Sequence, residues 1–386
     1  MLAVLAAAEL LGMTAWFSAT AASPALVAEF NLDTGGASWL TMAVQAGFVA
    51  GTLVSALANL PDIVNPRYLF AIGCVLAAVA NTLVTRADSG ATAITLRFAT
   101  GAALACVYPP GLKIAAGWFA HRRGLALGVI VGALTAGKAM PHLLQALFGA
   151  SGWRTPMLIA SALTIVSGVL VVVVVRDGPH VPTTSPFDPH AVTRLFRNPG
   201  ARQATFGYLG HMWELYAMWT WIAAFGVASL RAAGSLDPLR GGSLVAFVAI
   251  ASGTAGCVVA GYFGDRLGKA RVAASAMAVS AACCALTPLV FGAPVMILVA
   301  LVAVWGFSVV ADSAQFSALV AEYSRDYVGT ALTIQICLGF LLTAITIRLT
   351  PEIAAAIGWK WTFLALAPGP LAGIWALKPL LMNRPD

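Results

Sequence analysis

The sequence predicts an all-α membrane protein with twelve transmembrane helices arranged as two six-helix bundles. Hydrophobic residues make up 60% of the 386 residues and charged residues 10%, whereas soluble domains carry about 25% charged residues. The apolar residues form stretches of roughly 20, the length that a helix needs to cross a hydrocarbon core of about 30 Å. The longest polar break divides these stretches six and six.

The stretches are continuous runs of Ala, Leu, Val and Gly without strict alternation of polarity. In lipid a helix satisfies the backbone hydrogen bonds of such a run within itself. A strand of a β-barrel would show alternating polar and apolar residues instead. The expected spans are 2–24, 37–59, 68–86, 91–112, 123–148, 155–175, 204–229, 241–263, 271–291, 295–318, 327–349 and 359–381. Their even number places both termini on one side.

Lysine and arginine give the orientation. The breaks on the side of the termini hold 14 of these residues and the opposite breaks hold 6. By the positive-inside rule, both termini are cytoplasmic in a multi-pass plasma (inner) membrane protein. The lysines and arginines that the positive-inside rule places on the cytoplasmic side explain the net charge of +7. Nucleic-acid binding is therefore not expected. Residues 1–22 contain Glu9 and lack a basic leader, so they are expected to form the first span and not a cleaved signal peptide.

The sequence offers no catalytic or cofactor-binding motif. All six cysteines fall inside predicted spans, with neither a CxxC pair nor a histidine at ligand spacing, so we expect no disulfide frame, metal or cofactor. Phosphate-binding GxxxxGK[ST] and HExxH motifs are absent from the sequence, which argues against an enzyme and against ATP-driven transport. The expected partners are a small-molecule solute, protons and membrane lipid, and we expect a monomer.

A polar segment separates the two predicted bundles. We expect an N-terminal bundle over 1–175, a cytoplasmic linker over 176–203 and a C-terminal bundle over 204–386. The linker is rich in proline and arginine and has one short candidate interfacial helix at 192–196.

The two halves repeat each other's polar residues. Asp62 and Asp265 follow spans 2 and 8 at an offset of 203, and Glu9 and Glu214 lie in spans 1 and 7 at an offset of 205. A parallel repeat of this kind is typical of transporters that move two bundles about a midplane site. Separately, the Gly47-x-x-x-Gly51 and Gly128-x-x-x-Gly132 patterns predict close helix packing.

The break after span 8 resembles a family signature. Residues 261–271, Gly-Tyr-Phe-Gly-Asp-Arg-Leu-Gly-Lys-Ala-Arg, resemble the G-x-x-x-D-R-x-G-R-[RK] loop of the major facilitator superfamily. The copy after span 2 keeps Asp62 and Arg67, whereas Ile63 and Asn65 replace the usual Arg and Gly. Residues 97–101, Arg-Phe-Ala-Thr-Gly, resemble the R-x-x-Q-G element of that superfamily, with Thr in place of Gln.

The resemblance implies a carrier that works by alternating access. Residues 117–124 are loosely similar to the nitrate/nitrite and cyanate permease-like branch, although the paired binding arginines of nitrate carriers are missing. Span 5 departs from the drug-antiporter element because its proline comes late, after a lysine. In such a carrier, the loops that hold Asp62, Arg67, Asp265 and Arg266 have a gating role; the alternative is a plain interfacial salt bridge.

Ionisable residues inside spans are the candidate site residues. A charge at a helix centre costs roughly 2.5–3.5 kcal/mol on insertion scales, so such residues are retained for a function or a structural pair. The resemblance places spans 1, 4, 7 and 10 around a central cavity. The candidates are Glu9, Arg97, Lys138, His142, His211, Glu214 and Asp312.

Spacing groups these candidates into pairs. Lys138 and His142 are four residues apart and share a face of span 5, and His211 and Glu214 are three apart on span 7. Burial favours a neutral carboxylate and histidine changes charge near neutral pH, so Glu214 with His211 is predicted to carry a proton. Alternatively, His211 hydrogen-bonds Glu214 and stays neutral.

Aromatic and amide side chains complete the predicted site. Trp213 and Tyr216 of span 7 can wall a solute site, or they can serve only in packing. Gln315 shares a face of span 10 with Asp312.

The sequence therefore predicts a proton-coupled symporter of a small anionic solute. Lys138 and Arg97 attract the anion and His142 lies beside them. Glu9, His211, Glu214 and Asp312 are the proton-coupling candidates. The alternative is an efflux antiporter for a drug or metabolite, in which the acids bind a cationic substrate.

Overall fold

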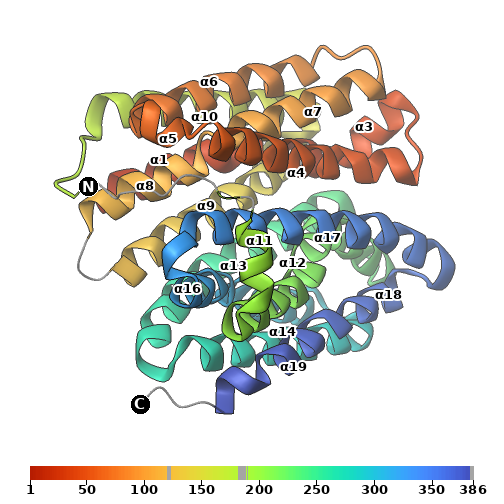
Figure 1. Ribbon diagram of the computed structural model, residues 1–386. Coiled ribbons are helices and arrows are strands. Elements are labelled where there is room, and N and C mark those ends of the chain that lie inside the picture. Colours follow the sequence, from red (N-terminus) through yellow and green to blue (C-terminus); the bar gives the residue numbers. More distant parts are fainter. Residues whose placement is uncertain (120–122, 181–187, 189, 383–386) are drawn as a thin grey trace.

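A computed structural model describes residues 1–119, 123–180, 188 and 190–382 (Figure 1). All the regular elements of these described residues are helices. The first part of the chain forms α1 (Leu2–Gly12), η1 (Met13–Ala15), α2 (Ser18–Ala21), α3 (Ser23–Phe30), α4 (Thr34–Leu57), α5 (Leu60–Ile63), α6 (Pro66–Val84), α7 (Gly90–Leu104), α8 (Tyr108–Trp118), α9 (Arg123–Phe148), η2 (Gly149–Ser151) and α10 (Arg154–Val174). The second part forms α11 (Ala191–Arg197), α12 (Pro199–Ala232), α13 (Pro238–Leu267), α14 (Lys269–Val290), α15 (Val295–Ala311), α16 (Ser313–Tyr323), η3 (Arg325–Tyr327), α17 (Val328–Ile357), α18 (Trp359–Thr362), η4 (Phe363–Leu366) and α19 (Pro368–Met382).

Ten helical stretches within the described residues are long and apolar enough to cross a membrane. The chain is therefore an integral, multi-pass membrane protein. The predicted first and seventh spans are not among the ten. Leu2–Ala15 is apolar but shorter. The 34 residues of α12 reach about 51 Å at 1.5 Å per residue, but α12 carries polar residues that include His211 and Glu214.

Polar side chains fix where several of the long helices begin. Asp33 accepts a hydrogen bond from the backbone N–H of Gly36 at 2.7 Å and caps α4. Ser89, Asn198 and Asp237 cap α7, α12 and α13 in the same way. Each cap satisfies an N–H group that the helix itself leaves without a partner, which is costly near lipid.

The first and second parts of the chain lie side by side. In Figure 1 the elements from α1 to α8 lie at the top, those from α11 to α19 lie at the bottom, and α9 runs beside α13 between them. The elements α5 and α16 lie at one end of the molecule and α3 and α18 at the other. We refer to these ends as the α5 end and the α3 end.

Four predicted spans are interrupted. The first changes from α1 through η1 to α2, and the twelfth changes from α18 through η4 to α19. The fourth divides into α7 and α8, and the tenth divides into α15 and α16. Tyr108 and Ser313, the first residues of α8 and α16, are 205 positions apart. Pro109 and Pro110 account for the break before α8, because proline lacks the N–H group that a continuous helix needs.

Glycines bring pairs of helices into backbone contact. A Cβ atom added at Gly47 or Gly101 would collide with a carbonyl oxygen of Phe98 or Val44, across the contact between α4 and α7. Gly256 and Gly306 meet the backbone in the same way between α13 and α15. The close packing predicted for Gly47 is confirmed. Gly132 also packs closely, because its added Cβ would lie 3.1 Å from the Thr254 carbonyl oxygen of α13.

The helix after the predicted linker begins earlier than the expected seventh span. Helix α12 begins at Pro199, five residues before the expected seventh span, because Asn198 caps it. The short helix expected at 192–196 is present as α11. Residues 181–187 and 189 of the predicted linker lie outside the described residues.

Candidate functional site

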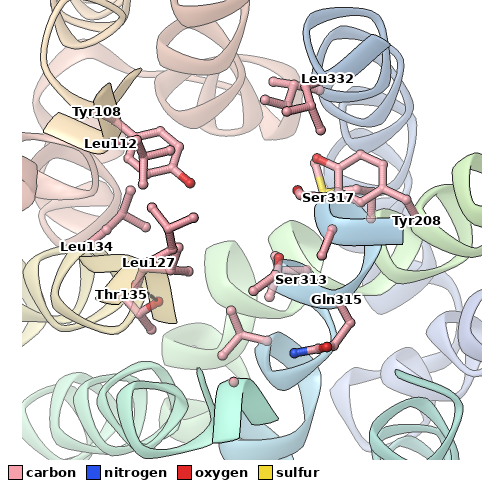
Figure 2. Close-up of a pocket in the computed structure, with 18 of the residues that line it drawn as sticks. Tyr108, Leu112, Leu127, Leu134, Thr135, Tyr208, Ser313, Gln315, Ser317 and Leu332 are labelled. Carbon is pink, nitrogen blue, oxygen red and sulfur yellow. Dashed lines mark hydrogen bonds between the residues drawn. The ribbon is translucent and has the colours of Figure 1, made fainter. Parts of the chain in front are cut away.

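A cavity of about 720 Å³ lies between the two parts of the chain. Figure 2 shows Tyr108 and Leu112 of α8, with Leu127, Leu134 and Thr135 of α9, on one side. Tyr208 of α12, Ser313 and Ser317 of α16 and Leu332 of α17 lie across from them. The lining is mainly apolar with a few polar groups, which is the usual composition of a small-molecule site.

The cavity is open at the α5 end. Asp265, Lys269, Glu322 and Arg325 contribute to its lining there, and all except the partly buried Lys269 are exposed. The side chain of Lys269 forms an ion pair with Glu322 beside this mouth. Solvent and small solutes therefore reach the cavity from the α5 end.

Helices α4 and α17 close the cavity toward the α3 end. The rings of Phe48 and Phe340 lie 5.4 Å apart. One turn further out, Thr343 Oγ1 donates a hydrogen bond to Gln45 Oε1 at 2.7 Å. At the surface, Thr34 donates to Glu352 at 2.9 Å. Together these three contacts join α4 to α17 from the closed end of the cavity to the α3 end.

Lys138 provides a positive charge at the closed end of the cavity. It is 3% exposed. Its Nζ donates a hydrogen bond to the Tyr216 hydroxyl at 2.6 Å and lies 4.1 Å from the centre of the Trp16 ring. Among the described residues no carboxylate oxygen lies within 4 Å of this amine. Because aromatic faces attract a cation without neutralising it, Lys138 can still bind an anion.

His211 and Asp312 form a buried pair behind the cavity wall. His211 Nδ1 lies 2.8 Å from Asp312 Oδ1, an ion pair when the ring is protonated, although the N–H does not point directly at the oxygen. The other ring nitrogen lies 3.1 Å from Ser313 Oγ. Ser313 also lines the cavity, so it connects this pair to the space that a solute can enter.

Glu214 does not join His211, which is the main correction to the predicted pairs. Its Oε1 accepts hydrogen bonds from Ser280 Oγ and Trp305 Nε1, both at 2.5 Å, and from Cys284 Sγ at 3.2 Å. These donors belong to α14 and α15, so Glu214 faces away from the ring of His211. It is not among the described residues that line the cavity.

Arg97 is not among the described residues that line the cavity. It is fully buried and holds the break in the first span. Its guanidinium donates to the Ala15 carbonyl at 3.0 Å, to Ser18 Oγ at 3.1 Å and to Asn81 Oδ1 at 2.7 Å, and also to the Trp16 carbonyl. The break leaves these carbonyls without helical N–H partners, and Arg97 supplies donors for them.

The remaining site candidates lie at different depths. Tyr216 and Gln315 line the cavity, and Gln315 Nε2 donates to the Ala260 carbonyl at 3.1 Å. Trp213 points away toward η4, where its indole N–H donates to the Ala365 carbonyl at 3.1 Å. Glu9 is buried against Gly111 of α8, and His142 is buried one turn beyond Lys138; neither is among the described lining residues.

The four gating candidates make unequal contacts. Asp62 forms an ion pair with Lys113. Arg67 pairs with Asp177 at 3.0 Å. The guanidinium of Arg266 lies 4.0 Å from the centre of the Tyr262 ring.

Asp265 lies at the open mouth of the cavity.

Sequence reasoning missed several lining residues. Tyr108, Tyr208 and Thr135 face the cavity (Figure 2). Pro109 and Pro110 were an available signal for Tyr108, because they mark a break in an otherwise apolar span. Tyr208 and Thr135 carry no comparable signal.

Comparisons with known proteins agree with this architecture. A sequence profile of the Major Facilitator Superfamily matches residues 5–311. The chain is 28% identical over 169 residues to the hexuronate transporter of Escherichia coli strain K12, and equally to that of Escherichia coli O157:H7. Each match covers 43% of this chain and 38% of the relative. Because the profile extends from α1 to the end of α15, the chain belongs to the Major Facilitator Superfamily of membrane transporters.

Proposed function

We propose that this protein is a secondary active transporter that moves a small anionic solute by alternating access. The observation that carries the proposal is Lys138, a buried cation at the closed end of a cavity between the two parts of the chain. Solute anions are attracted to a desolvated charge of this kind, and the surrounding wall excludes competing water.

The solute class that fits best is a sugar acid. Two relatives are hexuronate transporters, and a hexuronate has one carboxylate and several hydroxyl groups. In our proposal the carboxylate binds Lys138 and Tyr216. The hydroxyl groups bind Tyr108, Tyr208 and Gln315, which line the same cavity.

We infer that the chain crosses the membrane twelve times, as two six-helix bundles over 1–175 and 204–386 joined by the linker. The offset of 205 between the breaks at Tyr108 and Ser313 supports a repeat of this kind. With 14 basic residues on the side of the termini against 6 opposite, the termini and the α5 end are cytoplasmic in a plasma (inner) membrane. The cavity then faces the cytoplasm. We expect the protein to work as a monomer.

Proton coupling is assigned to Asp312 and His211 in this proposal. Their contact at 2.8 Å and the link through Ser313 to the cavity let their protonation respond to solute. Glu214 accepts hydrogen bonds from three donors away from the cavity lining, and Glu9 is buried behind the cavity lining. Because Lys138 is the cation beside the aromatic rings and these acids lie behind the wall, an exporter of cationic drugs fits the site less well.

The test is transport by purified protein in proteoliposomes. We expect radiolabelled D-glucuronate to accumulate when a pH gradient is imposed, and D-glucose and a quaternary ammonium ion not to accumulate. Lys138→Ala removes the cation and is expected to lower D-glucuronate uptake strongly at sub-saturating concentrations. Accumulation of the ammonium ion by the wild type, with no uptake of organic anions, would contradict the proposal.

A further inference from the structure

Two buried polar side chains next to Lys138 carry ring N–H groups that the contacts described above do not use: His142, which is not among the described lining residues, and Trp219, whose ring lines the cavity and lies 5.7 Å from Lys138 Nζ. His142 is four residues after Lys138 on α9, so it lies one turn closer to the α3 end on the same face. Neither of its ring nitrogens meets a hydrogen-bond partner among the described residues. Trp219 is three residues after Tyr216 on α12, and its indole N–H is likewise without a partner in the described part of the chain.

Both side chains are almost fully buried. His142 is 0% exposed and Trp219 is 1% exposed. Buried polar groups in folded proteins are nearly always hydrogen-bonded, because leaving one unpaired costs its lost hydration. Two such groups on facing helices beside a binding cation point to a ligand that they meet in another state of the transport cycle.

Phe17 fills the space between these groups. Its ring centre lies 6.3 Å from that of His142, 6.1 Å from that of Trp219 and 6.2 Å from that of Tyr216. Phe17 is fully buried, and its ring edge and face satisfy neither the imidazole nor the indole N–H as a hydrogen-bonding group would.

The backbone at Phe17 is suited to movement. The residue has φ −99° and ψ 15°, between η1 and α2, so it lies in the break of the first span and not inside a helix. A change in a few backbone angles there moves the ring without unfolding a complete helix. The neighbouring carbonyls at Ala15 and Trp16 are held by Arg97, which limits the movement to this segment.

We propose that His142 and Trp219 form a second sub-site, for the hydroxyl groups of the solute, which Phe17 fills in the state open at the α5 end and leaves in the state open at the α3 end. This inference rests on the proposed function. A neutral imidazole offers one donor and one acceptor and an indole offers one donor, which together match hydroxyl groups. The solute carboxylate stays at Lys138 in both states.

The proposal predicts affinities that differ between the two faces of the membrane. The measurement is the solute concentration that gives half-maximal transport, in right-side-out and in inverted membrane vesicles. The two solutes are D-glucuronate and cyclohexanecarboxylate, an acid that lacks hydroxyl groups. His142→Phe and Trp219→Phe are each expected to weaken D-glucuronate affinity from the α3 side by about tenfold, the size of one hydrogen bond to an uncharged group. Affinity from the α5 side and affinity for cyclohexanecarboxylate should remain unchanged.

Three further variants sharpen the test. Trp213→Phe is the matched control, because this tryptophan lies on the same helix but already donates to the Ala365 carbonyl; its affinities should not change. His142→Gln keeps a donor and an acceptor and should retain the wild-type affinity. Phe17→Ala should raise D-glucuronate affinity from the α5 side, because it clears the sub-site in the state that Phe17 otherwise fills.

The possible outcomes separate this inference from the proposed function. The sub-site is overturned if His142→Phe and Trp219→Phe lose affinity equally from both sides, or if neither variant changes affinity. In both cases D-glucuronate transport and its dependence on Lys138 would remain. Failure of the wild type to transport any organic anion overturns the proposed function and the sub-site together. If His142→Phe does not fold, Trp219→Phe and Phe17→Ala decide the matter.

Discussion

The amine of Lys138 donates its hydrogen bond to the hydroxyl of Tyr216 at 2.6 Å, and this contact joins α9 to α12 at the closed end of the cavity. The two residues belong to different parts of the chain. The solute that we propose would enter between them, since its carboxylate competes with the tyrosine oxygen for the same amine.

The first prediction concerns the role of Lys138. Lys138→Ala is expected to weaken binding of D-glucuronate about tenfold to a hundredfold, because a hydrogen bond to a charged group contributes about 1.5–3 kcal/mol. The melting temperature of the protein without solute should stay the same or rise, since the variant removes a buried charge that has no ion-pair partner among the described residues. A thermal-shift titration measures both. Unchanged binding with a large fall in melting temperature would show a structural role.

The second prediction concerns proton coupling. Asp312→Asn removes the titrating group opposite His211 and is expected to abolish D-glucuronate accumulation driven by a pH gradient, while counterflow at equal pH continues. Glu214→Gln is the matched control, because Glu214 lies away from the cavity among three donors. If the two phenotypes are reversed, Glu214 carries the proton. If accumulation survives both substitutions, neither carboxylate couples transport to protons.

The third prediction concerns Arg97. Arg97→Met removes the guanidinium donors to the carbonyls of Ala15 and Trp16 and to Asn81 Oδ1. The single hydroxyl of Ser18 then has to serve both the Ala15 carbonyl and Asn81 Oδ1. Each unsatisfied group costs about 1–3 kcal/mol, so we expect a clear fall in melting temperature in detergent. A direct anion-binding role predicts a different result, in which stability is unchanged and D-glucuronate affinity falls.

The fourth prediction concerns the closed α3 end. Thr343→Val removes the only side-chain donor that Gln45 Oε1 meets among the described residues and should favour the state open at that end. The readout is the rate at which a thiol reagent supplied from the α3 side labels a cysteine at Thr135 in a cysteine-free variant. We expect this rate to rise. Thr333→Val is the matched control on the same helix, because within the described part of the chain the Thr333 hydroxyl bonds only the Gly329 carbonyl. An equal rise in both variants would contradict the gate.

The fifth prediction concerns Glu29, outside the membrane-spanning segments. Hydrogen bonds from Trp153 and then from Arg154 hold the pKa of Glu29 below its usual value. The stabilisation is therefore present above the unfolded pKa of about 4.3 and is lost as the pH falls through the lowered folded pKa. The partly exposed pair contributes about 0.2–1 kcal/mol.

Glu29→Gln should lower the melting temperature slightly at pH 7. The difference from the wild type should disappear as the pH falls below about 4. A constant difference over this range would show that the contribution of Glu29 does not depend on its charge.

The membrane class and the helical fold were predictable from the sequence, because the length of an apolar stretch reflects the thickness of the bilayer. The pairing of buried residues was less predictable. Spacing on one helix placed His211 beside Glu214, but spacing cannot report which neighbouring helix offers donors. Ser280 and Trp305 of α14 and α15 bind Glu214, and Asp312 of the tenth span meets His211.

The helix break in the fourth span was predictable from the sequence, and those in the first and tenth spans were not. Pro109 and Pro110 mark the break before α8 in the sequence. The break between α15 and α16 falls at Asp312 with neither glycine nor proline beside it. Arg97 was predicted to bind solute because it is a buried charge, and its contact with the carbonyls of Ala15 and Trp16 required knowledge of a break that the first span does not signal.

The backbone contacts at the four packing glycines hold α4 against α7 and α13 against α15, so we expect each of these two helix pairs to move as one rigid unit. Helices that touch through carbonyl oxygens cannot slide past each other without a collision at Gly47, Gly101, Gly256 or Gly306. Spectroscopic labels placed within either pair should therefore report a constant distance throughout the transport cycle. Labels placed across α4 and α17 should report the opening of the α3 end that we propose, and the constant distance within each pair supplies the reference for that measurement.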